Sequence, residues 1–244
     1  MIKTAVILAA GMGTRLKERT KLIPKGFLEL NGITLIERSI KNLLAEGIEK
    51  IVIGTGHASE YYEELATKYP QMLCVKNPIY YETGSLYTLF GLKNYLDSDF
   101  LLLESDLLYQ KNGLSKIIKH TEKTVILASG MTHSNDEVFI ETDENHFLRA
   151  MSKKPEELNK IDAELTGINK ISRQTFEKMI DFAKLEFSKG NQHIHYEDAF
   201  VGVSRLENIF VYRLDDFIWC EIDDEDHLKR ALDNILPLIL QKEK

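Results

Sequence analysis

Apolar and polar positions alternate with two different periods along the first half of the chain. Short runs rich in β-branched residues predict buried strands, and segments with apolar residues at helical spacing predict amphipathic helices. The predicted strands span residues 4–9, 50–54, 72–76 and 100–104, and the predicted helices span 35–44, 59–69 and 85–95. This rhythm of strand and helix indicates a parallel sheet with right-handed crossovers and helices on both faces.

The second half of the chain is less regular. Strands are predicted at residues 124–129, 137–141, 147–151 and 165–171, and helices at 173–187 and 225–240. No repeat or linker separates the halves, so we expect a single α/β domain over residues 1–244, Rossmann-like, with a mixed, mostly parallel sheet flanked by helices. Ligands of such sheets bind at the carboxyl ends of the strands, here after Ala9 and Leu103.

Composition narrows the class of protein. The chain has 244 residues, with 31 Lys and Arg against 38 Asp and Glu, a formal net charge of −7. Nucleic-acid binding is not expected because it needs a basic face. No apolar run approaches the ~20 residues that span a bilayer, so no membrane association is expected. Two cysteines, Cys74 and Cys220, make neither a disulfide framework nor a cysteine metal site, which favours a cytoplasmic globular protein.

A glycine loop follows the first predicted strand. It reads Leu8-Ala9-Ala10-Gly11-Met12-Gly13-Thr14-Arg15-Leu16, with Pro24-Lys25 shortly after it. The spacing fits neither a dinucleotide fingerprint nor a P-loop. Two glycines let the backbone curl around an anion, and Arg15 and Lys25 add positive charge, so the loop predicts a phosphate site. A simple tight turn is the alternative.

This stretch resembles the signature of the nucleotidyltransferase superfamily that activates sugar phosphates, phosphocholine and related compounds with a nucleoside triphosphate. The resemblance implies a nucleotide-binding part over about residues 1–130 and an acceptor-binding part over about 131–244. It implies that Leu8, Ala10 and Gly11 border the base and ribose. It also implies that Gly13, Thr14 and Arg15 hold the triphosphate and that Lys25 contacts the α-phosphate, with Lys25 and Arg15 as catalytic residues.

Acidic residues stand at the ends of two distant segments. The apolar run 100–104 leads into Ser105 and Asp106, and the alternation over residues 221–223 predicts a strand with both acids on one face. Mg²⁺ prefers oxygen ligands, and water and substrate phosphate oxygens fill part of its coordination shell. One or two protein carboxylates therefore suffice to bind it. The resemblance implies that Asp106 and Asp223 are the metal ligands and that Ser105 contacts ribose or base. Helix capping is the alternative for Asp106.

The remaining site residues depend on the same resemblance. Thr83, Gly84 and Ser85 precede a predicted helix and would contact the base or ribose, although helix capping explains either hydroxyl equally well. The acceptor would meet Thr166 and Gly167 and the Tyr196-Glu197-Asp198 run, with capping as the alternative for both acids. Lys154 would hold a phosphonate or belong to a solvated loop. Acids suit a compact ammonium group, whereas trimethylammonium needs an aromatic cage.

The predicted activity is Mg²⁺-dependent transfer of CMP from CTP to 2-aminoethylphosphonate or a similar amino-alkyl phosphonate or phosphate. The resemblance is to the branch that includes 2-aminoethylphosphonate and bacterial phosphocholine cytidylyltransferases. A phosphocholine cytidylyltransferase, a sugar-1-phosphate nucleotidyltransferase and an inactive regulatory domain are the alternatives. The sequence does not separate CTP from UTP, and it leaves the oligomeric state open, with a homodimer among the alternatives.

Overall fold

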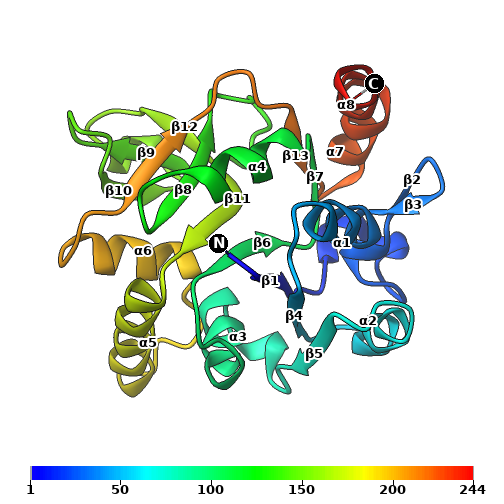
Figure 1. The fold of residues 1–244 in the computed structure, drawn as a ribbon, viewed down its shortest axis with the longest axis horizontal. Coiled ribbons are helices and arrows are strands. Elements are labelled where there is room, and N and C mark those ends of the chain that lie inside the picture. The colour runs from blue at the N-terminus through cyan, green and yellow to red at the C-terminus, as the bar shows by residue number, and fades with distance from the viewer. Residues whose placement is uncertain (1, 244) are drawn as a thin grey trace.

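A mixed sheet lies at the centre of the molecule (Figure 1). The computed structural model describes residues 2–243, apart from the side chains of residues 17 and 18. The parallel part of the sheet has the order β6-β1-β4-β5, formed by β1 (Thr4–Ala9), β4 (Lys50–Thr55), β5 (Met72–Lys76) and β6 (Phe100–Glu104). These four strands agree with the predicted ones to within one residue, and the predicted fold class is confirmed.

The strand β11 (Ala163–Ile171) joins this parallel part to the rest of the sheet. It runs antiparallel to β6, to β8 (Val125–Ser129) and to β9 (Phe139–Thr142). Beyond these strands, β10 (Leu148–Ser152) pairs antiparallel with β9, and β12 (Phe210–Arg213) pairs parallel with β8. The register of β11 against β8 shifts between Leu165 and Asn169, and Gly167 within this bulge has a φ of +73°. The bulge brings the β11 backbone close to the side chain of Glu104.

Helices cover both faces of the sheet (Figure 1). Val6 and Leu8 of β1 belong to a core that also contains residues of α3 (Ser85–Gly91), α5 (Arg173–Ser188) and α6 (Tyr196–Ser204). Ala5 and Ile7 belong to the opposite core, with α1 (Leu35–Ala45), α2 (Ser59–Ala66) and α4 (Asn112–Lys119). Because successive side chains of a strand alternate between faces, a strand buried on both sides is almost entirely apolar, as β1 is after Thr4.

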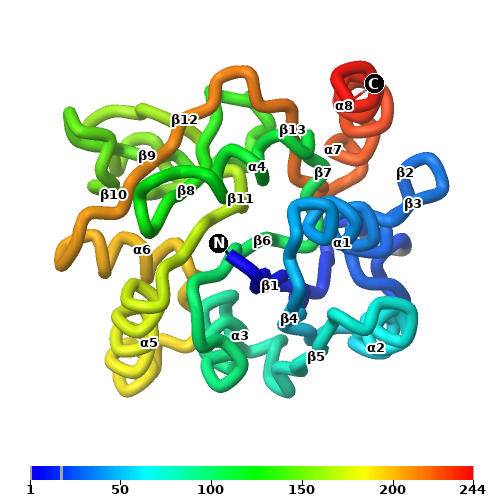
Figure 2. The backbone as a smooth tube through the Cα atoms, viewed as in Figure 1, coloured from blue at the N-terminus to red at the C-terminus, as the bar shows by residue number. Residues whose placement is uncertain are grey.

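A short antiparallel ribbon joins two distant parts of the chain beyond the end of β6. Its strands are β7 (Leu107–Tyr109) and β13 (Trp219–Glu221), which lie side by side in both views (Figures 1 and 2). The N–H of Ile222 donates to the carbonyl of Asp106 at 3.1 Å. The ribbon therefore holds Asp106 close to the segment that carries Asp223.

The predicted strand over residues 221–223 is wrong in its extent, because β13 ends at Glu221. The chain leaves the ribbon to begin α7 (Glu225–Arg230), where Asp224 is the N-cap and accepts a hydrogen bond from the N–H of His227. The predicted helix 225–240 is also interrupted, by a π turn at Ala231–Ile235 before α8 (Leu236–Lys242). Pro237 has no N–H to continue the helical hydrogen bonds across this turn.

The other elements are small. A hairpin is formed by β2 (Glu29–Leu30) and β3 (Ile33–Thr34), and Leu30 belongs to a third apolar cluster with residues of α7 and α8. The predicted helix over residues 85–95 divides into α3 and a 3₁₀ turn at Lys93–Tyr95. Within residues 2–243, no helix is long and apolar enough to cross a membrane. Cys74 and Cys220 are both free thiols, as expected.

Candidate active site

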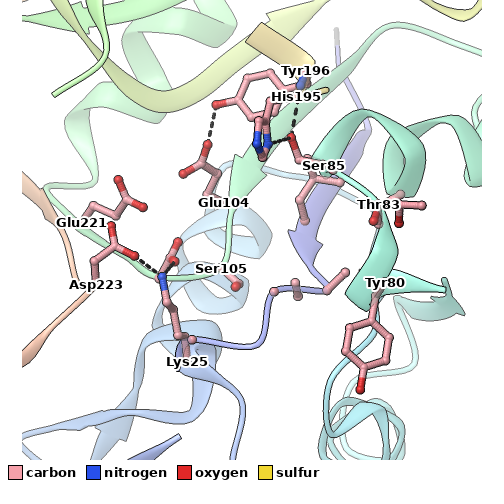
Figure 3. Close-up of a pocket in the computed structure, with 18 of the residues that line it drawn as sticks. Lys25, Tyr80, Thr83, Ser85, Glu104, Ser105, His195, Tyr196, Glu221 and Asp223 are labelled. Atoms are coloured by element: carbon pink, nitrogen blue, oxygen red, sulfur yellow. Dashed lines mark hydrogen bonds and ion pairs between the residues drawn. The ribbon is translucent and has the colours of Figure 1, made fainter. Parts of the chain in front are cut away.

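A cavity of about 400 Å³, called the main cavity below, opens at the carboxyl ends of β1 and β6 (Figure 3). Segments from both halves of the chain form its walls. The predicted residues that line it are Leu8, Ala10, Gly11, Gly13, Thr14, Arg15, Lys25, Thr83, Gly84, Ser85, Ser105, Asp106, Tyr196, Glu197 and Asp223. All residues predicted to bind the nucleotide therefore share one cavity.

The glycine loop turns sharply at Gly13. Its φ is +62°, and a Cβ atom there would come within 2.8 Å of the Lys25 side chain. The hydroxyl of Thr20 donates to the Gly13 carbonyl at 2.6 Å, which ties the loop to the segment before Lys25. By contrast, Gly11 has open space beside it. Glycine is needed at Gly13 because the left-handed backbone and the close approach of Lys25 both exclude a larger residue.

The ammonium of Lys25 joins the two predicted metal ligands. Its Nζ lies 2.9 Å from Oδ2 of Asp106 and also pairs with Oδ1 of Asp223, a residue 198 positions away (Figure 3). Burial alone would lower the pKa of Lys25, but the charges of Asp106 and Asp223 outweigh it and raise this pKa. Burial would raise the pKa of Asp223, but the charge of Lys25 lowers it well below its usual range. At neutral pH the ammonium and the Asp223 carboxylate are therefore both charged.

A cluster of carboxylates lies beside this lysine. Oxygen atoms of Glu104, Asp106 and Glu221 lie within 4.8 Å of one another. Burial, followed by the charge of Asp106, raises the pKa of Glu104 to about 8, and the same two causes raise that of Glu221. Oδ2 of Asp223 is buried with no hydrogen-bond partner among the described residues. A divalent cation such as Mg²⁺ would neutralise these crowded carboxylates, whose hard oxygen atoms are the ligands that it prefers.

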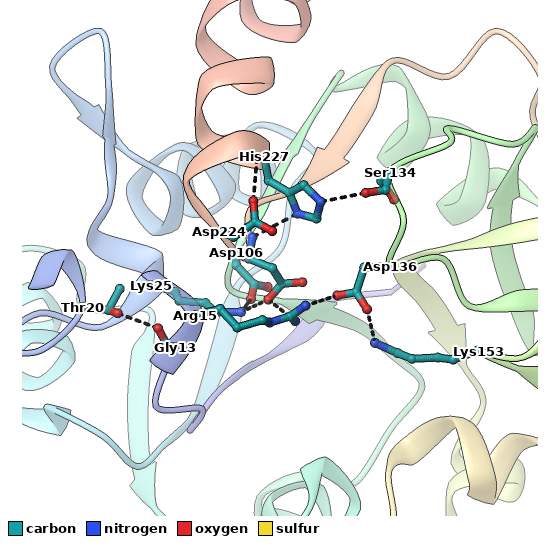
Figure 4. Close-up of polar contacts among 11 residues, drawn as sticks. Gly13, Arg15, Thr20, Lys25, Asp106, Ser134, Asp136, Lys153, Asp224 and His227 are labelled. Atoms are coloured by element: carbon teal, nitrogen blue, oxygen red, sulfur yellow. Dashed lines mark hydrogen bonds and ion pairs between the residues drawn. The ribbon is translucent and has the colours of Figure 1, made fainter. Parts of the chain in front are cut away.

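Charged pairs continue from Asp223 through Arg15 and Asp136 to Lys153 (Figure 4). Nη2 of Arg15 lies 2.9 Å from Oδ1 of Asp223, and its Nη1 lies 2.7 Å from Oδ2 of Asp136. The other oxygen of Asp136 pairs with Nζ of Lys153 at 2.8 Å. Arg15 and Lys153, which come from different halves of the chain, thus share one carboxylate.

The segment before α3 packs against the start of α6. Gly84 has no room for a Cβ atom, which would overlap the carbonyls of His193 and Ile194. Ser85 Oγ accepts a hydrogen bond from the N–H of Tyr196 at 3.1 Å. The hydroxyl of Thr83 donates to the carbonyl of Ile79 at 2.9 Å. Both hydroxyls therefore have structural partners, while Thr83, Gly84 and Ser85 still line the main cavity.

A second cavity of about 70 Å³, called the small cavity below, adjoins the main one. Thr166 and Gly167 line it, and Glu197 and Lys153 line both cavities. Glu197 has a buried Oε2 with no hydrogen-bond partner among the described residues, and burial, together with the charge of Asp198, raises its pKa to about 7. The hydroxyl of the neighbouring Tyr196 donates a hydrogen bond to Oε1 of Glu104.

Two residues predicted to bind the acceptor line neither cavity. Nζ of Lys154 lies 3.2 Å from Glu157 on an exposed turn, and the adjacent Lys153 reaches the cavities instead. Asp198 accepts a hydrogen bond from the N–H of His195 at 2.8 Å and so caps α6, which was the alternative role for this acid. Thr166 does line the small cavity, but its hydroxyl donates to the carbonyl of Leu127 at 2.8 Å.

Asp136 and Tyr80 are site residues that the sequence does not predict. Asp136 joins Arg15 and Lys153, and Tyr80 lines the main cavity before Thr83 (Figure 3). Asp136 lies between two predicted strands in a segment without periodicity. No signal in the sequence indicates its contacts, which depend on how the two halves of the chain come together.

Comparison with known proteins gives the family. Residues 5–161 match the model of the MobA-like NTP transferase domain. A choline-phosphate cytidylyltransferase from Streptococcus pneumoniae is 27% identical over 234 residues, 95% of this chain and 97% of the relative. A 2-aminoethylphosphonate cytidylyltransferase from Lancefieldella rimae is 33% identical over 104 residues, so the match spans 42% of each chain.

The fold agrees with that of solved structures. The inositol-1-phosphate CTP transferase from T. maritima superposes with a TM-score of 0.82 at 18% identity, covering 99% of this chain and 96% of that one. At this identity the likeness shows the fold alone, while the family match covers well over half of the chain. The chain therefore belongs to the MobA-like NTP transferase family and is a nucleotidyltransferase.

Proposed function

We propose that this nucleotidyltransferase is a Mg²⁺-dependent cytidylyltransferase that transfers CMP from CTP to a small amino-alkyl phosphonate or phosphate, such as 2-aminoethylphosphonate, and releases pyrophosphate. The observation that carries the proposal is the contact of Lys25 with both Asp106 and Asp223 beside the glycine loop. The two relatives named above are cytidylyltransferases, and this chain aligns with 97% of one and 42% of the other, which supports CTP as the donor.

The chain's own residues would align the donor. The loop from Ala10 to Thr14 offers backbone N–H groups to phosphate oxygens, and Arg15 can bind a phosphate in bidentate fashion. Lys25 would move from the carboxylates to the α-phosphate and neutralise charge there. Mg²⁺ held by Asp106 and Asp223, with Glu104 and Glu221 nearby, would supply further neutralisation of the triphosphate.

No general base is required in this reaction. A phosphate-type acceptor has a second pKa near ~6, so its attacking oxygen is already anionic at neutral pH. The barrier is then set by repulsion between two anions and by their alignment, and both are reduced by fixed positive charge and a rigid site. Arg15, Lys25 and Lys153, which line the main cavity, are the groups that can reduce this repulsion.

The acceptor's amino group would lie near the small cavity. Glu197 has a buried carboxylate oxygen without a partner there, and Glu104, Glu164 and Glu221 line the same space. A compact ammonium donates hydrogen bonds to carboxylates, whereas trimethylammonium needs aromatic faces. Among the described residues that line the small cavity, Trp219 is the one with a Phe, Tyr or Trp ring, and it is buried and donates its Nε1–H to Ser129. This lining favours a primary amine over choline.

An acceptor panel tests the proposal. The purified chain is incubated with Mg²⁺ and either CTP or UTP, and with 2-aminoethylphosphonate, phosphoethanolamine, phosphocholine or glucose-1-phosphate. Pyrophosphate release gives the rate, and mass spectrometry identifies the product. We expect the highest kcat/KM with CTP and an acceptor that carries a primary amine. Preference for phosphocholine would refute the assignment of the small cavity, and preference for UTP or the sugar phosphate would refute the cytidylyltransferase proposal.

A further inference from the structure

Asp136 pairs with cations that a phosphorylated ligand also needs. We propose that the Asp136 carboxylate competes with the substrate for Arg15 and Lys153. In the free protein it pairs with both cations, and a phosphoryl group of the substrate displaces it. The inference rests on the proposed function only in taking the ligand to carry phosphoryl groups, as the nucleoside triphosphate donor of a nucleotidyltransferase does.

The geometry is that of one anion held between two cations (Figure 4). Oδ2 of Asp136 lies 2.7 Å from Arg15 and Oδ1 lies 2.8 Å from Lys153. The Asp136 side chain is 16% exposed, whereas those of Arg15 and Lys153 are 51% and 59% exposed. Both cations line the main cavity, so they are accessible to a ligand there. A phosphate or phosphonate, with its several anionic oxygens, can take the same two donors.

The segment that carries Asp136 is fixed at two other points. Glu164, which is buried, accepts hydrogen bonds from the N–H and hydroxyl of Thr132 at 2.6 and 2.8 Å. Nε2 of His227 lies 3.0 Å from the carbonyl oxygen of Ser134 (Figure 4). These contacts hold the backbone on both sides of His133 and set the direction from which Asp136 approaches. The pairing is therefore a built contact between elements, unlike a surface ion pair within one helix.

The balance of charges explains why the ion pairs of Asp136 have to break when a phosphate group binds. The chain of neighbours Lys153–Asp136–Arg15–Asp223–Lys25–Asp106 alternates in sign, so each cation is neutralised. A phosphate group bound by Arg15 would face the Asp136 carboxylate and be repelled. Binding thus requires that Asp136 release Arg15 and Lys153. Because the unpaired form is the one that binds, pairing lowers the apparent affinity for any small anion.

Equilibrium binding of inorganic pyrophosphate tests this inference. The full chain and its Asp136→Asn variant are titrated by calorimetry at fixed ionic strength, with EDTA present so that no metal contributes. Two partly exposed ion pairs correspond to about 2- to 30-fold in affinity, and we expect the variant to bind pyrophosphate more tightly by this factor. Asp136→Ser serves as a second variant if the amide disturbs folding, which circular dichroism reports.

The control is Asp215→Asn. Asp215 pairs with Arg213 at 2.7 Å on the surface and lines neither cavity, so this variant should bind pyrophosphate as the wild type does. Unchanged or weaker binding by the Asp136 variants would overturn the inference, and so would the absence of binding by every protein. Tighter binding combined with an inactive acceptor panel would instead refute only the proposed function, because the titration involves neither CTP nor turnover.

Discussion

Replacement of Lys25 by alanine separates the electrostatic role of this residue from its structural one. The ammonium contacts Asp106 and Asp223, and its side chain is only 15% exposed. Loss of one pre-positioned donor to developing charge reduces turnover by about 10²–10³, equivalent to about 2.7–4 kcal/mol. Removal of one partner of a fully buried pair costs ~3–5 kcal/mol of stability. The expected stability loss here is smaller, about 1–3 kcal/mol, because Arg15 still neutralises Asp223.

The assay measures kcat by pyrophosphate release and stability by urea denaturation. Turnover is compared well below the melting temperature of the variant, so that unfolding does not enter the rate. Lys41→Ala is the matched control, because Lys41 pairs with Glu37 on the surface of α1 and should leave kcat unchanged. A folded Lys25→Ala protein with kcat within about twofold of the wild type would refute the assigned role.

Four further changes have defined outcomes. Glu197→Gln should raise KM for an amino-bearing acceptor about tenfold while KM for CTP stays constant, as steady-state kinetics would report; equal changes in both would contradict the assignment. Because the folded-state pKa of Glu197 is raised to about 7, its contribution to stability is present below its unfolded value of ~4.5 and is lost as pH rises toward 7. The urea midpoint of the wild type should therefore fall relative to Glu197→Gln between pH 5 and 8, and parallel profiles would argue against this. Gly84→Ala should destabilise the protein by about 1–3 kcal/mol by thermal denaturation, whereas Gly91→Ala, with open space, should not. EDTA should abolish turnover, and added Mg²⁺ should restore it. Mg²⁺ should also raise the melting temperature of the protein, because it relieves the repulsion among Glu104, Asp106 and Glu221. Turnover that persists in EDTA would exclude the metal requirement.

Periodicity predicts the four parallel strands well, and of these β1, β4 and β6 are almost wholly buried while the edge strand β5 is only partly buried. The strands β1, β4, β5 and β6 are short apolar runs bounded by turn residues, so their pattern has one interpretation. The helix α4 was missed because it is brief and carries Gly113, which lowers helix propensity. The strand β12 was missed although it pairs fully with β8. Its four residues show no period long enough to recognise.

The candidate site was predictable where residues lie in one local motif. The glycine loop with Lys25 is a continuous signature, and Asp106 follows directly from the end of β6. The choice between Lys153 and Lys154 was not predictable, because neighbouring residues on a bend differ only in the direction of their side chains. The contacts of Asp136 and Glu221 form between segments distant in sequence, so only tertiary structure brings them to the main cavity.

The proposed function depends on Asp106 and Asp223 acting together at the nucleotide. Its most direct test is the rate of CMP transfer from CTP to 2-aminoethylphosphonate by wild type, Asp106→Asn and Asp223→Asn, measured side by side at saturating Mg²⁺. Each variant should lose at least about 10²-fold in kcat/KM while remaining folded. Either variant transferring CMP at a rate close to that of the wild type would contradict the proposed function.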